Sequence, residues 1–120
     1  MGRVVLVVDD DSTVLDTVVF MLEELGCEVI GARNGQEALD ELSRNDRIEI
    51  LITDINMPEM DGHELAHRAQ RIRPQLRVLQ LSGREPRRGG YPMIRKPFSF
   101  DDLANTMQQT TGTCYLQPAL

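Results

Sequence analysis

The chain has 120 residues, a net charge of −6 and 41% hydrophobic residues. This length and composition fit one globular domain with a hydrophobic core and leave no room for a second. The acidic balance argues against direct nucleic-acid binding, which usually needs a basic surface. No apolar run approaches the length of a membrane span, and no signal-peptide pattern opens the chain. We therefore expect a cytoplasmic protein without membrane insertion, in which Cys27 and Cys114 are reduced thiols.

The first part of the chain predicts two strand–helix units. Residues 4–8 form a continuous apolar, β-branched run, typical of a strand buried on both faces. Asp11 or Ser12 can cap the helix that follows. A short second strand is expected over residues 27–30, and Asn34 has the side chain and position to cap a second helix.

The second part predicts three more strands and two more helices. Strands are expected over residues 48–53, 78–81 and near 93–95. Helices are expected to begin at the capping residues Asp61 and Ser99. This alternation implies an α/β fold in which a five-stranded parallel sheet carries helices on both faces. In such sheets the functional crevice lies at the carboxyl ends of the strands.

Acidic, hydroxyl and amine side chains follow four of the expected strands. Because the carboxyl ends of parallel strands meet at one edge of the sheet, a single site could gather all of these side chains. They are Asp9, Asp10, Asp54, Ser82 and Lys96.

Three motifs in this order resemble the receiver domain of two-component response regulators. They are the acidic pair Asp9-Asp10, the segment ITDINMPEMDG that carries Asp54, and Lys96-Pro97-Phe98. Ser82 matches the hydroxyl that receivers carry after their fourth strand. The resemblance covers nearly the whole chain. It implies a flavodoxin-like fold with strand order 2-1-3-4-5, a receiver domain over residues 1–112 and a C-terminal tail over residues 113–120.

The resemblance implies phosphoacceptor chemistry at Asp54. This carboxylate would take a phosphoryl group from a phosphohistidine of a sensor histidine kinase or phosphotransfer protein. The protein would catalyse its own phosphorylation and slow dephosphorylation, without turnover of a separate substrate. Mg²⁺, or Mn²⁺ in its place, would be held by Asp10, Asp54 and the backbone carbonyl of Asn56, with Asp9 acting through water.

The remaining family positions concern the phosphoryl oxygens and the switch. Lys96 would supply a positive charge to a phosphoryl oxygen, and the hydroxyl of Ser82 would supply a hydrogen bond. In the family, that hydroxyl moves together with an aromatic residue three positions before the lysine. Here that position is Met93, and Tyr91 is the nearest aromatic alternative. The Lys96-Pro97 bond is expected to be cis, as it typically is in receivers.

The segment between Ser82 and Lys96 departs from the family. It has 13 residues, GREPRRGGYPMIR, with two prolines and three glycines. This composition predicts that the fourth helix is missing or reduced to one turn. Such short segments resemble receivers attached to hybrid histidine kinases, or small stand-alone receivers. We therefore expect unusual output, without the dimer that receivers often form through this face.

Three other interpretations compete with the phosphoacceptor. A pseudo-receiver would bind a partner through the same fold without phosphate, and the short segment and Met93 leave that interpretation open.

The second competing interpretation is a phosphatase. Asp9, Asp11 and Thr13 also fit the first motif of haloacid-dehalogenase-like phosphatases. The later acidic pair Asp101-Asp102 would then have to end a strand, but it falls in the first turn of an expected helix. Asp11 is better suited to capping a helix than to binding metal.

The third competing interpretation is a zinc protease. The segment from His63 to His67 spells H-E-x-x-H, the signature of zinc-dependent proteases. No convincing third ligand follows on a second helix, and Glu85 is the nearest option. An exposed helix after the Asp54 loop is the simpler explanation.

Overall fold

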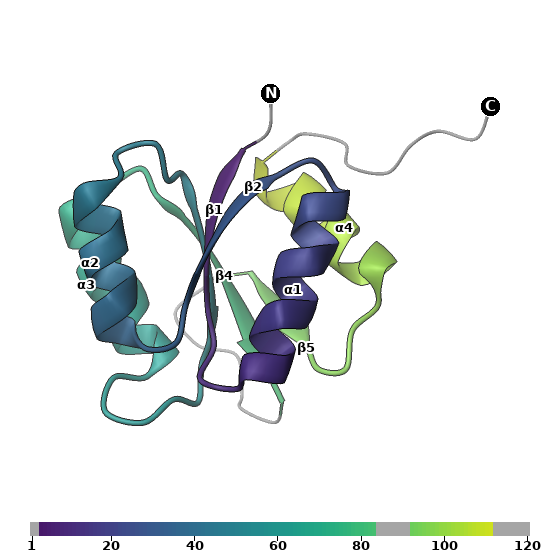
Figure 1. The fold of residues 1–120 in the computed structure, drawn as a ribbon, viewed down its shortest axis with the longest axis horizontal. Coiled ribbons are helices and arrows are strands. Elements are labelled where there is room, and N and C mark those ends of the chain that lie inside the picture. The colour runs from purple at the N-terminus through teal and green to yellow at the C-terminus, as the bar shows by residue number, and fades with distance from the viewer. Residues whose placement is uncertain (1–2, 84–91, 112–120) are drawn as a thin grey trace.

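The structure is a computed structural model that describes residues 3–83 and 92–111 (Figure 1). Its strands and helices alternate along the described chain until the last two strands, which follow one another. The elements are β1 Val4–Val8, α1 Ser12–Glu24, β2 Glu28–Ala32, α2 Gly35–Arg44, β3 Ile50–Asp54, α3 Gly62–Ile72, β4 Arg77–Ser82, β5 Met93–Arg95 and α4 Phe100–Thr111.

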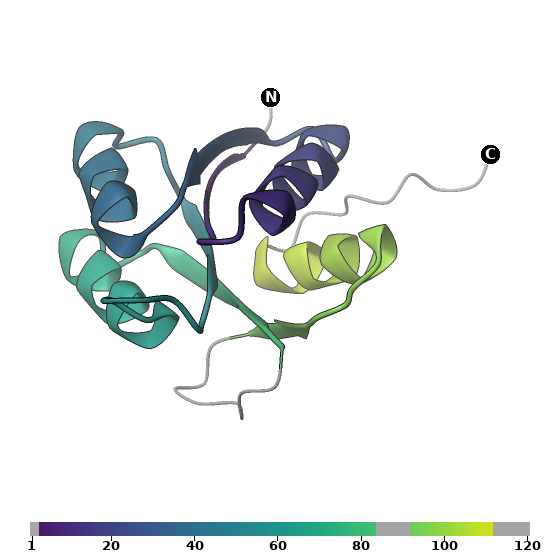
Figure 2. The ribbon, with the colours of Figure 1, turned by 60° about the horizontal axis from the view of Figure 1, so that its bottom comes forward.

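All five strands pair in parallel, in the order β2-β1-β3-β4-β5. This order confirms the predicted fold class. The helices α1 and α4 cover one face of the sheet, and α2 and α3 cover the other (Figures 1 and 2). The winding reverses between β1 and β3, which places the functional crevice of such a fold at their carboxyl ends.

The hydrophobic core consists of two layers separated by the sheet. Every residue of β1 and β3 is buried, so the central strands contribute side chains to both layers. Val5 and Val7 pack with α1 and α4, whereas Leu6 packs with α2 and α3. Cys27 is a buried free thiol in the layer between the sheet and helices α1 and α4, and burial raises its pKa to about 11. A raised pKa keeps Cys27 in the less reactive thiol form at neutral pH. Cys114, the other cysteine expected to be reduced, lies outside the described residues.

Three strands differ from the sequence prediction in their bounds. β4, Arg77–Ser82, is one residue longer at each end than the predicted 78–81. β2 begins and ends later than predicted, because its pairing with β1 continues until Val8 meets Ala32. β3 begins at Ile50 rather than Ile48, and Ile48 is a buried residue of the preceding turn. An apolar run shows which residues are buried, but the partner strand decides where pairing begins.

The helix caps follow the prediction. Asp11 is the N-cap of α1 and accepts hydrogen bonds from the backbone N–H groups of Thr13 and Val14. At α4, Ser99 and Asp102 each accept a hydrogen bond from the other's backbone N–H, which is a capping box. The interpretation of Asp11 as a helix cap is therefore confirmed.

The connection from β4 to β5 is short. It spans residues 83–92, ten residues between the bounds of the two strands. Residues 84–91 lie outside the described part of the chain, so the predicted loss of the fourth helix falls there, as does Tyr91. The predicted tail, residues 113–120, also lies outside it. Among residues 3–83 and 92–111, none of the helices has the length and hydropathy needed to cross a membrane.

Candidate functional site

Three carboxylates converge at the carboxyl edge of the sheet. Asp9 directly follows β1, and Asp54 ends the adjacent strand β3. Both are buried, with exposed fractions of 0% and 6%, whereas Asp10 is exposed. One oxygen from each of the three lies within 4.8 Å of the others. The structure thus brings together the acidic residues that the sequence analysis singled out.

Lys96 joins this cluster from the end of β5, the edge strand of the sheet. Its Nζ lies 3.2 Å from Oδ1 of Asp54 and 3.3 Å from Oδ2 of Asp9. Its backbone N–H donates to the carbonyl of Ser82 at 2.7 Å, which ties Lys96 to the end of β4. The Lys96-Pro97 peptide bond is cis, as expected. A single cation therefore contacts both buried carboxylates.

Burial and charge shape the protonation of these groups. Burial raises the pKa of Asp54, and the neighbouring carboxylate of Asp9 adds to this effect, while Lys96 opposes it. Burial likewise raises the pKa of Asp9. The hydrogen bond that Asp9 accepts from the backbone N–H of Asp11 and the charge of Lys96 lower this pKa, but burial outweighs them. Partial burial disfavours the charged form of Lys96, but Asp54 and Asp9 together outweigh it and raise its pKa. The cluster is therefore short of positive charge.

The donor set fits a hard divalent cation such as Mg²⁺. Carboxylate oxygens are the ligands that Mg²⁺ and Mn²⁺ take in proteins, and three of them already share one small region. An added cation would also relieve the shortage of positive charge. Asp9, Asp10 and Asp54 each offer one oxygen to such a cation. Asn56, whose carbonyl is the fourth expected ligand, is exposed in the loop after Asp54.

A close backbone approach fixes the loop that carries Asp54. The N–H of Gly62, at the start of α3, donates to the carbonyl of Ile55 at 2.8 Å. A Cβ at Gly62 would lie 2.3 Å from the backbone oxygen of Asp54, so only glycine fits here. Asp61 caps the same helix by accepting from the N–H of Glu64. Asp61 and Gly62 of the loop motif thus connect the end of β3, which carries Asp54, to the start of α3.

Ser82 lies beside the cluster, at the end of the strand that neighbours β3. It is fully buried, and its hydroxyl accepts a hydrogen bond from Nη1 of Arg95 at 3.3 Å. The sequence analysis did not single out Arg95. Its contact depends on the register of the parallel β4–β5 pair, in which Arg95 lies opposite Ser82, and the sequence carries no signal of that register. Met93, the predicted switch position, is half-buried two residues earlier on β5.

The structure gives the H-E-x-x-H segment a different role from zinc binding. His63 Nδ1 lies 3.2 Å from Nε2 of Gln80, a fully buried residue of β4, and His67 is exposed. In the part of the chain that the structure describes, neither histidine belongs to a group of three metal-ligating side chains. The segment therefore forms the first turns of α3, as expected.

The phosphatase alternative also lacks its geometry. Asp11, its second motif residue, caps α1. Asp101 and Asp102, its final acidic pair, lie in the first turn of α4 rather than at a strand end. Asp11, Asp101 and Asp102 therefore do not form a phosphatase site with Asp9.

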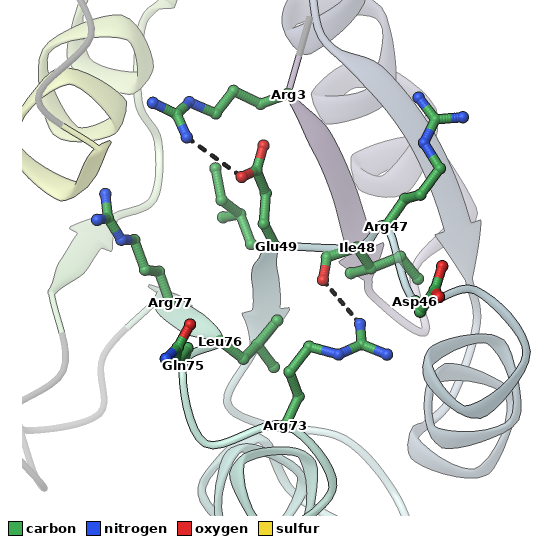
Figure 3. A pocket seen from close by; sticks show the side chains of 10 residues that line it. Arg3, Asp46, Arg47, Ile48, Glu49, Arg73, Gln75, Leu76 and Arg77 are labelled. Atoms are coloured by element: carbon green, nitrogen blue, oxygen red, sulfur yellow. Dashed lines mark hydrogen bonds and ion pairs between the residues drawn. The ribbon is translucent and has the colours of Figure 1, made fainter.

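A cavity of about 660 Å³ lies at the opposite, amino-terminal edge of the sheet (Figure 3). Several arginines line it, but their contacts are structural. Arg73 donates to the carbonyl of Ile48 at 2.7 Å, and Arg3 pairs with Glu49 at 3.2 Å. Arg77 donates to a backbone carbonyl in the last turn of α4 at 2.8 Å. These bonds tie helix ends and turns to the sheet, far from the acidic cluster.

Fold and site together define a class: a doubly wound α/β protein with a lysine-paired acidic pocket at the carboxyl edge of its sheet. The family model for the response regulator receiver domain matches residues 5–108. The chain belongs to this family.

Individual relatives agree with this assignment. The response regulator receiver protein CpdR of Brucella abortus is 34% identical over 115 residues, which cover 88% of this chain and 93% of that protein. A solved receiver domain protein of Clostridium thermocellum is 29% identical, with a TM-score of 0.84 over 93% of this chain and 95% of that one. The receiver domain of the hybrid histidine kinase CckA is 31% identical, with a TM-score of 0.80 over 89% and 97% of the two chains.

Proposed function

We propose that this receiver is a working phosphoacceptor that takes a phosphoryl group on Asp54 from a phosphohistidine. The observation that carries the proposal is the convergence of Asp9, Asp10, Asp54 and Lys96 on one small region at the sheet edge. Family membership makes a histidine kinase or a histidine phosphotransfer protein the expected donor. A pseudo-receiver would have no need to keep two buried carboxylates and a lysine together.

Each side chain has a role in the transfer. An oxygen of Asp54 attacks the phosphorus atom, the bond from phosphorus to the donor's imidazole nitrogen breaks, and that nitrogen keeps the electron pair. Lys96 Nζ, 3.2 Å from the acceptor carboxylate, offers positive charge to an oxygen of the incoming group. The hydroxyl of Ser82 donates a hydrogen bond from the neighbouring strand. A divalent cation held by Asp10 and Asp54 would supply further positive charge when bound.

Dephosphorylation reverses the state of the protein. Water attacks the phosphorus, the bond to the Asp54 oxygen breaks, and inorganic phosphate leaves with the carboxylate regenerated. The same positive charges that favour transfer onto Asp54 also stabilise this transition state. The chain therefore catalyses a change in its own state and acts as a timed switch rather than as an enzyme with a separate substrate.

Mass spectrometry tests the proposal. The protein is incubated with Mg²⁺ and acetyl phosphate, and the intact mass and peptides are measured for wild type, Asp54→Asn and Asp16→Asn. Asp16 is an exposed residue of α1 and serves as the matched control. One phosphoryl group on Asp54, absent in Asp54→Asn and after chelation of Mg²⁺ but present in Asp16→Asn, is the expected result. No adduct, together with no binding of beryllofluoride, would refute the proposal and favour the pseudo-receiver.

A further inference from the structure

The cavity at the amino-terminal edge of the sheet gathers positive charge in a protein that is acidic overall (Figure 3). The chain carries a net charge of −6, yet four arginines and only two carboxylates line this cavity of about 660 Å³. The arginines are Arg3, Arg47, Arg73 and Arg77, and the carboxylates are those of Asp46 and Glu49. An excess of one sign of charge around a cleft raises the local concentration of ligands of the opposite sign. The cavity therefore favours an anion.

Two of these arginines have no carboxylate partner. Arg73 donates to three backbone carbonyls at the end of α2 and in the turn before β3, at 2.7 to 3.2 Å. Arg77 donates to the carbonyl of Thr110 in α4 at 2.8 Å. In the described ranges 3–83 and 92–111, neither side chain forms an ion pair with a carboxylate. Carbonyl groups carry no net charge, so these hydrogen bonds hold each guanidinium in place and leave its charge for a ligand.

Arg3 and Arg77 reach the cavity from the same face of the sheet. Ile50 is the register partner of both Val5 and Arg77, so the side chains of these three residues stand on one face. Arg3 lies two residues before Val5 and continues that face. In the sheet order, β3 alone separates β1 from β4, and Figure 3 shows both arginines directed toward α4. Their two guanidinium groups can therefore approach one ligand from two sides.

The carboxylate of Glu49 does not close this site. Its ion pair with Arg3 is 3.2 Å long, and the two side chains are 44% and 34% exposed. Ion pairs exposed to this degree are weak, because water screens the charges. A phosphate group offers more charge than one carboxylate, and its oxygens match the guanidinium fork in pairs. Phosphate would therefore replace Glu49 at Arg3 and add a contact with Arg77.

The size of the cavity indicates the kind of ligand. A volume of about 660 Å³ lies within the usual range for small-molecule sites, about 300–1,000 Å³. We propose that this cavity binds a small phosphorylated molecule through Arg3 and Arg77, with Arg73 adding positive charge. Gln75, an exposed residue that lines the same cavity, has an amide that can bind the rest of the ligand. The inference does not rest on the proposed function, because the cavity lies at the edge of the sheet opposite to Asp54.

An NMR titration with pyrophosphate tests the site directly. The full chain is titrated in the presence of EDTA, so that no metal ion can link the probe to the acidic cluster, and the arginine Nε–H and backbone signals are recorded. We expect saturable shifts at Arg3 and Arg77, with a dissociation constant below about 1 mM, and no shifts around Asp54. Absence of saturable shifts at the two arginines would overturn the proposal. Tighter binding of a hexaglutamate peptide than of pyrophosphate would also overturn it, in favour of an acidic protein segment as the partner.

Single variants locate the binding. Arg77→Met and Arg3→Met are each expected to weaken pyrophosphate binding about fivefold, the scale of a partly exposed charge-assisted hydrogen bond. Arg77→Lys, which keeps the charge but not the planar fork, should recover part of the loss. Arg71→Met, which removes an exposed charge from α3 outside the cavity, is the matched control and should bind as wild type does. Equal weakening in Arg71→Met, or full affinity in both cavity variants, would overturn the proposal.

A thermal measurement covers the case in which Arg77→Met fails to fold, since Arg77 also bonds to α4. A ligand that binds the folded state alone raises the unfolding temperature as its concentration increases. Pyrophosphate should therefore raise the unfolding temperature of wild type, and raise it less in Arg3→Met. No rise in wild type, or an equal rise in Arg3→Met, would overturn the proposal. Labelling of Asp54 by acetyl phosphate should be unchanged in Arg3→Met, and its absence in wild type would refute the acceptor while leaving this site in place.

Discussion

The carboxylates of Asp9 and Asp54 are buried at a cost that Lys96 offsets only in part. Contacts of 3.3 and 3.2 Å to the lysine would by themselves lower the pKa of each carboxyl group, yet burial raises both. A buried charge that lacks full compensation destabilises the folded state. The buried carboxylates of this site therefore lower the stability of the folded state, as a site kept for the proposed phosphoryl transfer would.

Asp54→Asn should raise the free energy of unfolding in metal-free buffer at neutral pH, by roughly 1 kcal/mol. The folded-state pKa of Asp54 lies above its ordinary value, so its favourable contribution exists below that ordinary value and is lost as pH rises through the folded-state pKa. The neutral amide avoids this loss. Urea unfolding of wild type and variant checks the difference, which should shrink on acidification and on addition of Mg²⁺.

Asp16→Asn is again the matched control, because it removes an exposed carboxylate from α1. It should leave the free energy of unfolding unchanged within about 0.5 kcal/mol. A wild type more stable than Asp54→Asn without metal would contradict the prediction, since it would mean that the Lys96 contact outweighs the burial of the carboxylate.

Residue type and strand-end position were enough to predict Asp9, Asp10, Asp54 and Lys96 from the sequence. Parallel strands bring their carboxyl ends together whatever their length, so that prediction needed no register. The contact of Arg95 with Ser82 was not predicted, because it depends on which residue of β5 lies opposite the end of β4. An exposed arginine gives no signal of this kind in a sequence.

The elements themselves show what a single strand or helix can reveal. Caps are local, so Asp11, Asn34, Asp61 and the Ser99 capping box could be predicted from a few neighbouring residues. Strand ends are not local, and the predicted bounds of β2, β3 and β4 were wrong by up to two residues because their partners set the pairing. The start of α3 combines both kinds of information, since Asp61 caps the helix locally while Gly62 is required by a close contact with the end of β3.

Gly62→Ala should destabilise the protein by about 2 kcal/mol. The added Cβ would lie 2.3 Å from the backbone oxygen of Asp54 and 2.8 Å from Cα of Ile55, and backbone atoms cannot move aside as a side chain can. Gly31→Ala in β2 is the control, because its Cβ would meet Cδ1 of Leu15 at an ordinary 3.5 Å. Equal unfolding midpoints for the two variants would contradict this account of the β3–α3 junction.

At the scale of the whole molecule, the β4–β5 side of the sheet sets this receiver apart. The connection between these strands has ten residues, one fewer than α3, so a helix of that length does not fit in it. β5 itself has three residues and ends in an exposed arginine. We therefore expect this receiver to differ from others at the surface that receivers often use for dimers.

We expect the chain to stay monomeric when beryllofluoride and Mg²⁺ are added. The sequence predicts a missing or one-turn fourth helix, which would offer little surface at this face, and stable interfaces need well over about 1,000 Å². Size-exclusion chromatography with light scattering, with and without beryllofluoride at one protein concentration, measures the change. A dimer that appears only with beryllofluoride and maps to β5 and α4 by cross-linking would contradict the expectation.

The length of β5 also affects how long Lys96 stays in contact with the carboxylates of the site. Three register pairs join it to β4, compared with five between β1 and β2. In a folded protein, the elements with the fewest neighbours open most often, without unfolding the rest. Each such opening would carry Lys96 away from the carboxylates, while Asp9 and Asp54 stay on the central strands. Lys96 thus follows the strand with the fewest register pairs in the sheet. The fraction of time for which β5 is paired with β4 therefore sets the fraction of time for which the site is complete.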